Sequence, residues 1–356
     1  MVGVKLSYEW RQVQFASVAF FGVVSISISV FITTAFAEQP AFSSQSIAPF
    51  FSTNQSPIVQ IHGLPAIDSA AVLPDQRVRY RLTHDLASNY TFSNVSNNAA
   101  NENLLFDGET NRSTFTYSRG TGTGWEWGVQ IPFVSHGAGS LDGFIEDWHD
   151  TFSLPQGGRD TAAHNQFTYR YQRNGVTELL LTESDSGIGD VRLTMGKQWS
   201  SVGQGTRLAL RGALSLPTGD SDELLGSGAI DAAVWATADR SQQWLSYPGS
   251  LFGGGGVLLM GEGDVLANQQ RRIVAFGSFG GGLRVQPWMS LKLQADIHSP
   301  FYDDSELEQI NATAVQLLMG GDLQLAKNIR LDLMVGEDFT VHASPDVVFH
   351  LGLVVE

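Results

Sequence analysis

The stretch Trp288-Met-Ser-Leu-Lys-Leu-Gln-Ala-Asp-Ile-His298 decides the fold class, because apolar and polar side chains alternate along it. A period of two places the apolar side chains on one face of a β-strand and the polar ones on the other. A short connector, Gln286-Pro287, separates it from a second alternating stretch at residues 271–285. The two stretches therefore predict neighbouring strands of one sheet.

The start of the chain indicates where these strands reside. Basic residues precede an apolar run at residues 15–32, which ends in Ala35-Phe-Ala37. This order is typical of a secretory signal peptide, here residues 1–37 with cleavage after Ala37. An uncleaved membrane anchor is the alternative, because a spanning helix needs about 20 apolar residues.

The composition narrows the function classes. Asp and Glu number 36 against 21 Lys and Arg, which argues against a nucleic-acid partner. The chain has no cysteine, which excludes a disulfide framework and a thiolate metal site, and we expect no cofactor. Charged residues make up 16% of the chain, against about 25% in typical soluble proteins, and there are 38 glycines. A secreted, strand-rich chain of this kind predicts either a soluble sandwich or propeller, or an outer-membrane barrel.

The connectors between the predicted strands favour the barrel. We count about fourteen strands, with twelve as the alternative, and long connectors mostly alternate with short ones. A membrane barrel needs this parity because its short turns lie at the periplasmic end and its long loops at the outer end. An even strand number places both chain ends on the periplasmic side. We therefore predict an all-β fold, a transmembrane antiparallel β-barrel at residues 76–356.

Residues 38–75 precede the first predicted strand as an N-terminal extension. Its stretch at residues 52–65 is apolar enough to pack but has no strand partner. We expect this stretch to enter the barrel from the periplasmic side and plug the lumen. The expected plug residues are Asn54, Gln55, Pro57 and His62.

The polar faces of the predicted strands carry charges of both signs, which we expect to line the lumen. A lumen of mixed charge either conducts water and small solutes or closes through internal ion pairs. The main lumen-lining candidates are Arg77, Arg79, Arg81, Glu126, Arg170, Arg192, Arg211, Asp231, Lys292, Asp296 and Asp332. Further candidates on the same faces are Arg207, Arg284, Arg330, Glu178 and Asp322.

The longest connector contains a predicted amphipathic helix at residues 140–152, which we expect in an outer loop. The helix carries Glu146, Asp147 and His149, with Trp148 on its apolar face. These acids and the histidine are residue types that ligate metals or act as bases. The favoured interpretation is a helix over the barrel mouth with solvated charges.

A glycine-rich loop at residues 217–228 has the glycines of a phosphate-binding loop but lacks the required Lys-Ser or Lys-Thr pair and the following helix. Alternating stretches flank it, so we expect it to join two strands. Its acidic residues Asp220, Asp222 and Glu223 offer only a weak calcium site, and no other metal site is expected.

A barrel that hydrolyses lipid is the alternative from another function class. Such an enzyme needs a serine beside a histidine that a third group orients. The chain offers Ser135-His136 and His298-Ser299, but adjacent strand residues point to opposite faces. Each histidine would need another serine across the lumen.

Several motifs resemble a family of Gram-negative envelope proteins that lacks an assigned function. The motifs are Asp107-Gly-Glu, Trp125-Glu-Trp-Gly, Asp142-Gly-Phe-Ile-Glu-Asp-Trp-His149, Leu154-Pro-Gln-Gly-Gly-Arg159, Gly187-Ile-Gly-Asp190, Leu216-Pro-Thr-Gly-Asp220, Gly226-Ser-Gly228 and Pro345-Asp-Val-Val-Phe-His350. More loosely, the Gly-x-Gly-Asp and Pro-Thr-Gly-Asp elements are similar to barrels of the aromatic-degradation pathway and long-chain fatty-acid transporter type. The resemblance implies a barrel that passes small molecules, apolar ones among them. The chain departs from outer-membrane barrels in ending Leu353-Val-Val-Glu356, where Phe or Trp is common, which weakens the expected recognition by the assembly machinery.

Taken together, the sequence predicts a passive, gated transporter of small molecules in the outer membrane of a Gram-negative cell. Its expected partners are outer-membrane lipid, the outer-membrane assembly machinery and a small-molecule solute. The alternatives are the lipid hydrolase and a structural or adhesion barrel without transport.

Overall fold

The computed structural model describes residues 46–95, 101–139, 141–152, 163–199, 205–244, 246–339 and 343–356. The predicted signal peptide at residues 1–37 lies outside the described residues.

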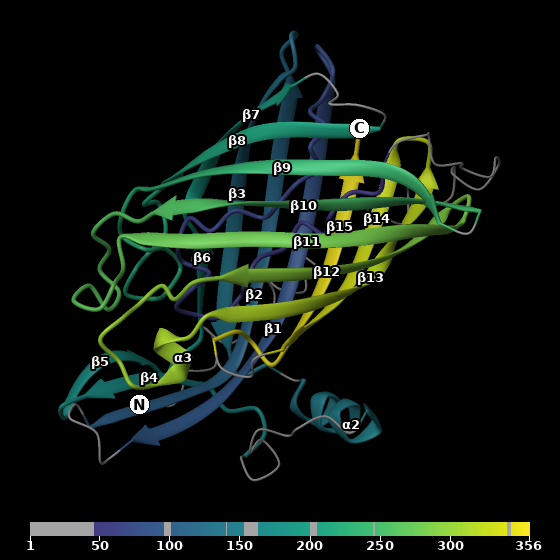
Figure 1. Ribbon diagram of the computed structural model, residues 1–356. Coiled ribbons are helices and arrows are strands. Elements are labelled where there is room, and N and C mark those ends of the chain that lie inside the picture. Colours follow the sequence, from purple (N-terminus) through teal and green to yellow (C-terminus); the bar gives the residue numbers. More distant parts are fainter. Residues whose placement is uncertain are drawn as a thin grey trace, which may run out of the picture.

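Twelve antiparallel strands form a closed barrel (Figure 1). The ring closes because β1 pairs with both β15 and β2, while β3 pairs with both β2 and β7. The barrel strands are β1 (Val78–Val95), β2 (Glu102–Gly120), β3 (Trp125–Gly137), β7 (Val191–Trp199), β8 (Thr206–Leu216), β9 (Asp231–Trp244), β10 (Tyr247–Leu259), β11 (Ile273–Gln286), β12 (Met289–His298), β13 (Ala314–Ala326), β14 (Ile329–Asp338) and β15 (Val347–Val355). Closure leaves no long unpaired edge in the wall.

The count of fourteen was wrong and the alternative of twelve is correct. Two alternating stretches, β4 (Thr168–Arg173) and β5 (Val176–Leu181), form a hairpin beside the extended end of β2 rather than part of the wall. Each has six residues, fewer than the roughly 9 to 11 that span a bilayer. A further strand, β6 (Asp185–Ile188), pairs with β3 in a stretch expected to be a connector. Because both strands of the β4–β5 hairpin leave the count together, long and short connectors still alternate along the barrel.

Two helices lie in the long connectors. The predicted outer-loop helix is present as α2 (Asp142–Phe152), and a single turn, α3 (Glu308–Asn311), lies between β12 and β13. Neither helix among the described residues has the length and apolar character needed to cross a bilayer.

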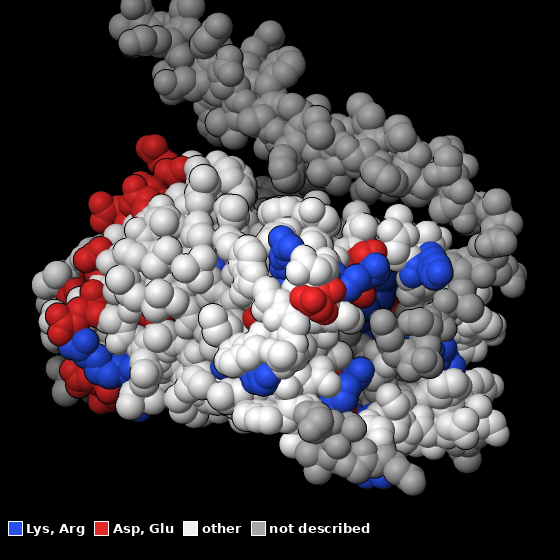
Figure 2. Space-filling view, turned by 90° about the horizontal axis from the view of Figure 1, so that it is seen from above, with Lys and Arg blue, Asp and Glu red and all other residues white. Residues whose placement is uncertain are grey.

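The outer surface of the barrel is apolar. Leu291, Leu293 and Ile297 of β12 are each about half exposed, and large apolar side chains on the other strands are exposed in the same way. Figure 2 shows a broad surface without charged side chains, next to an end where Asp and Glu gather. Apolar surface of this extent is stable in contact with lipid rather than water.

Aromatic side chains gather on the outer surface near the short turns. The Tyr117 ring lies 5.7 Å from the Tyr80 ring and 5.5 Å from the Trp127 ring, measured between centroids. Tyr and Trp favour the membrane–water interface, because one end of each ring is apolar and the other is polar. The short-turn end of the barrel therefore meets one surface of the bilayer here.

The N-terminal segment, defined here as residues 46–75, lies inside the barrel (purple in Figure 1). The amide of Ile47 donates to Ser250 Oγ near the short-turn end of β10. The side chain of Gln60 then reaches the carbonyl of Leu224 in a long connector, and the amide of Leu73 returns to Glu126 near the β2–β3 turn. The segment thus runs from the short-turn end toward the long loops and back.

Candidate functional site

The lumen is the candidate site, because the inward side chains of the wall meet the N-terminal segment there. The segment is not a strand, so its backbone amides need partners other than a sheet ladder. Inward side chains of the wall supply these partners at 2.8 to 3.0 Å. The pairs are Phe50 N to Gln294 Oε1, Gly63 N to Asp231 Oδ2, Ala70 N to Asp239 Oδ2 and Leu73 N to Glu126 Oε2.

Asp68 of the segment forms the closest ion pair between the segment and β1. Its carboxylate lies 3.2 Å from Arg81 Nη1 and 3.9 Å from Arg79 Nη1. Burial by itself would raise the pKa of Asp68, but the charges of Arg81, Arg211 and Arg79 outweigh burial and hold this pKa well below its usual range. The Arg81 guanidinium also stacks 3.8 Å from the Phe51 ring centroid, so Arg81 contacts the segment twice.

A second group of charges holds the returning arm of the segment. Arg211 Nη2 donates to the carbonyl of Ser69 at 2.6 Å, while its Nη1 lies 3.1 Å from Glu126 Oε1. Asp239 accepts from the Ser69 hydroxyl at 2.8 Å and from Arg207 Nε at 2.7 Å. Wall charges of both signs therefore bind the segment as well as one another.

The expected lumen cation Lys292 is buried at the centre of a cluster of charges. Its Nζ lies 2.9 Å from Asp332 Oδ1 and 3.4 Å from Asp322 Oδ2, and Arg330 Nε lies 3.6 Å from the same Asp332 oxygen. The Lys292 ammonium also lies 4.1 Å from the centroid of the Phe50 ring. This cluster neutralises its own charge and packs against the entering arm of the segment.

The expected plug residues are all buried in the turn of the segment. Asn54 Nδ2 lies 2.8 Å from His298 Nε2 and donates to the carbonyl of Ala343 at 2.9 Å. His62 Nε2 lies 2.9 Å from the Tyr302 hydroxyl, which donates to the carbonyl of Ile58. Burial raises the pKa of Tyr302, so this hydroxyl stays protonated.

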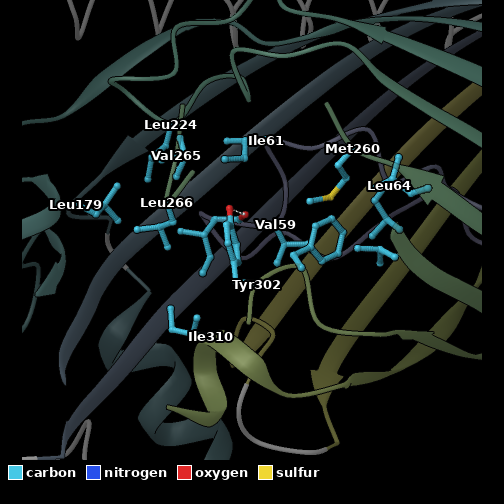
Figure 3. Close-up of a cluster of buried hydrophobic side chains, with 14 of the residues drawn as sticks. Val59, Ile61, Leu64, Leu179, Leu224, Met260, Val265, Leu266, Tyr302 and Ile310 are labelled. Atoms are coloured by element: carbon cyan, nitrogen blue, oxygen red, sulfur yellow. Dashed lines mark hydrogen bonds between the residues drawn. The ribbon is translucent and has the colours of Figure 1, made fainter. Parts of the chain in front are cut away.

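Apolar side chains seal the turn of the segment toward the long loops. Figure 3 shows Val59 and Ile61 of the segment beside Leu224, Leu266 and Tyr302, which come from three different connectors. The cluster continues onto β4 and β5 through buried Tyr169, Tyr171, Leu179 and Leu181. The hairpin miscounted as barrel wall therefore helps to cover the outer end of the lumen.

Three of the predicted lumen residues lie elsewhere. Arg77 is exposed just before β1, where the chain leaves the lumen. Arg170 and Glu178 lie on β4 and β5, outside the barrel wall, because these two strands are too short to span the membrane. Asp296 does face the lumen, where its Oδ1 accepts from Gln294 Nε2 at 2.9 Å.

Sequence reasoning missed several lumen residues, of which Asp85, Arg112 and His350 are the most central. Asp85 Oδ1 accepts from His350 Nδ1 at 2.7 Å and from Ser52 Oγ at 2.6 Å. Arg112 Nη1 donates to both oxygens of Gln60. The alternation that revealed Arg81 applies to each of these positions and would have found them.

Among the described residues, no hydrogen bond joins a serine hydroxyl to either histidine weighed for hydrolysis. His136 contacts Thr110 Oγ1 at 3.0 Å and the Leu224 carbonyl at 3.1 Å, and His298 contacts Asn54. In the group of Ser52, Asp85 and His350, the carboxylate separates the hydroxyl from the imidazole. A serine nucleophile needs the imidazole beside its hydroxyl, so this order does not match a catalytic triad.

The outer-loop candidates lie on α2 and in the loop at residues 217–228. On α2, Glu146 Oε1 lies 2.9 Å from His164 Nε2, and Asp147 is exposed; the side chains of Trp148 and His149 lie outside the described part. Asp220 Oδ1 accepts the amide of Asp222, which shapes the loop. Among the described residues, no group of three or more His, Asp or Glu is arranged to hold a metal ion. The neighbouring acids and burial raise the pKa of Glu223.

Comparison with known protein families explains the motifs that run along this chain. Residues 23–356 match the model of a family described as a protein of unknown function, DUF3187. The chain belongs to the DUF3187 family. This membership confirms the resemblance to an envelope family without an assigned function. A comparison with curated protein sequences finds no match.

One solved structure shares the fold, and two further structures match with lower TM-scores. The COG4313 outer membrane channel from Pseudomonas putida F1 matches with a TM-score of 0.51 and 12% identity, over 80% of this chain and 97% of that one. The NanC porin matches with a TM-score of 0.42 and 6% identity, over 79% and 100% of the chains. The Pseudomonas putida toluene transporter TodX matches with a TM-score of 0.32 and 8% identity, over 89% and 98%. At these identities the likeness to the first structure establishes the fold, that of an outer-membrane barrel.

Proposed function

We propose that the protein is a passive channel for small molecules in the outer membrane, and that the N-terminal segment gates it. The proposal is carried by how this segment is held in the lumen. It is bound through side chains of the wall, with no strand pairing to the barrel. Such a segment can leave and rebind without disturbing the ladder of the wall.

The strength of these contacts suits a gate. A hydrogen bond contributes only about 0.5 to 1.5 kcal/mol net, because water replaces the partner when the bond opens. Glu126, Asp231 and Asp239 would be hydrated once the segment withdrew toward the short-turn end. Closed and open states can therefore differ by a few kcal/mol although many contacts change.

The lining of the lumen favours water-soluble solutes over the apolar ones that the looser resemblance implies. An apolar molecule that passed Arg81, Arg211 or Lys292 would desolvate a charge without giving it a partner, which is costly. Water and hydrogen-bonding solutes avoid this cost. We therefore assign the channel to small polar molecules.

Conductance of the refolded chain in a planar bilayer tests the gate in two directions. A chain that begins at Gln76 lacks the segment and should conduct more than the mature chain. The variant Ile47→Cys/Gly282→Cys should conduct less when oxidised, because a Cβ at position 282 would lie 3.1 Å from Ile47 Cβ, near the separation of a disulfide. The chain has no other cysteine, so reductant should restore the behaviour of the mature chain.

The matched control is Ile47→Cys alone, which oxidant should not affect. Equal conductance of the mature and shortened chains, together with no effect of the disulfide, would refute the gate. Silence from every folded variant would refute transport and favour the structural barrel or the hydrolase.

A further inference from the structure

A polar cavity lies between the N-terminal segment and one side of the wall. It is narrow, with a free volume of about 30 Å³, so it suits a few waters or one small ion. The wall contributes Arg112 from β2, Gln130 from β3 and Arg192 from β7, and the segment contributes Gln60 and His62. Register pairs Gln130 with Arg192, so these side chains face the lumen at the same depth.

Arg192 is a buried cation with almost no partners. It is 6% exposed, and among the described residues its one hydrogen bond runs from Nη2 to the carbonyl of His62 at 3.4 Å. Its Nε is buried without an acceptor. Arg112, on the same cavity, donates to the neutral oxygens of Gln60 and to no other described residue. Two guanidinium groups thus share one cavity, and within the described part of the chain neither lies within ion-pair distance of a carboxylate, although Asp85, Asp190 and Asp231 attract them from farther away.

Two acids, Asp85 and Asp190, also line this cavity, and both accept hydrogen bonds from donors other than the two arginines. Asp190 accepts four hydrogen bonds from the long β8–β9 connector, donated by the amides of Thr218, Gly219 and Ser227 and the hydroxyl of Ser227. Asp85 Oδ1 accepts from Ser52 and His350. A buried guanidinium without an anion is expensive, and a small oxyanion would supply the missing acceptors.

We propose that Arg112 and Arg192 bind the oxyanion group of a small solute, a carboxylate or a phosphate. The guanidinium fork matches the geometry of both groups. The same two arginines hold the carbonyls of Gln60 and His62 at the turn of the segment. An anion is a stronger acceptor than a carbonyl, so its binding competes with the segment for these donors.

The proposal also names the class of solute that the channel passes, and this assignment rests on the proposed function. An anion that enters the cavity weakens the hold of the wall on the segment at its turn. Anionic solutes therefore favour the open lumen, whereas neutral solutes of the same size do not. Binding itself requires no transport and can be measured separately.

Isothermal titration calorimetry on the folded, detergent-solubilised mature chain in chloride-free buffer tests the site, with inorganic phosphate and acetate as probes. At least one probe should bind, and Arg192→Gln should weaken binding about tenfold or more, as for the loss of a hydrogen bond to a charged group. Arg170→Gln is the matched control, because this arginine lies outside the barrel, and it should leave binding unchanged. Binding of phosphate alone would assign phosphorylated solutes, and binding of acetate alone would assign carboxylates.

Binding of neither probe to the mature chain, or equal binding by Arg192→Gln, would overturn the proposal. If Arg192→Gln does not fold, crystals of the mature chain soaked in selenate decide the matter. Anomalous density between Arg112 and Arg192 is the expected result, and density only elsewhere, or none, overturns it. Binding without conductance would leave the site intact and refute the channel, whereas conductance without binding would refute the site alone.

Discussion

Replacing Asp68 by alanine should release the N-terminal segment from the lumen. Asp68 is the segment's partner for Arg81, at 3.2 Å, and Arg79 lies 3.9 Å away. Breaking a buried ion pair by removing one partner costs about 3 to 5 kcal/mol, because the other charge stays buried and unpaired. The Asp68 side chain is 12% exposed, so water reaches the pair and the lower end of this range, about 3 kcal/mol, applies.

Because about 1.4 kcal/mol corresponds to a factor of ten, the ratio of closed to open channels should fall about a hundredfold. Single-channel recording measures this ratio through the open probability, which should rise by up to the same factor. The double variant Asp68→Ala/Arg81→Ala should change the closed-to-open free energy by less than the sum of the two single variants, because no unpaired arginine is left in the lumen. A change in open probability of less than threefold in Asp68→Ala would show that this ion pair does not hold the segment.

Three further predictions follow from the same geometry. Acid should open the channel, because the pKa of Asp68 is lowered when the segment is bound. The contribution of Asp68 to closing is therefore complete above the ordinary Asp pKa of about 4 and is lost as the pH falls below this value. Open probability that stays flat down to pH 3 would contradict this prediction. Gly63→Val should also raise the open probability, because a Cβ at this position would lie 2.8 Å from Asp231 Cβ, whereas Gly143→Val on α2 meets nothing within 4 Å and should behave like the unaltered chain. Leu293→Arg, at the middle of the lipid-facing side of β12, should lower the free energy of unfolding by about 2 to 4 kcal/mol in urea titrations in lipid. Trp288→Arg, near the turn, should lower it by only about 0 to 1 kcal/mol. Equal losses in the two variants would mean that this face does not meet the bilayer core.

The sequence by itself determined the class of the fold and the direction of most side chains. Alternation in β12 places Leu291 and Leu293 outside and Lys292 and Gln294 inside, and this depends only on the geometry of an extended strand. The parity of the connectors required a barrel with short turns at one end. The closed barrel in turn predicted that residues 52–65 lie in the lumen, because it offers no strand edge with which an extra segment could pair.

Only the pairing of strands in three dimensions fixed the number of strands in the wall and the ion-pair partners of the lumen charges. Alternation over six residues is the same in a spanning strand and in a loop hairpin, so only the pairing of β4 with β2 removed Arg170 from the lumen. A period of two tells which face a charge occupies but not what lies across the barrel. Asp68 and Arg81 are 13 positions apart, and their pairing depends on the segment lying in the lumen. Lys292 and Asp332 are 40 positions apart, and their pairing depends on the register of β12, β13 and β14. The missing ion pair of Arg192 is likewise a property of the closed lumen, because β7, β2 and the N-terminal segment meet there around Asp85 and Asp190, which other donors already hold.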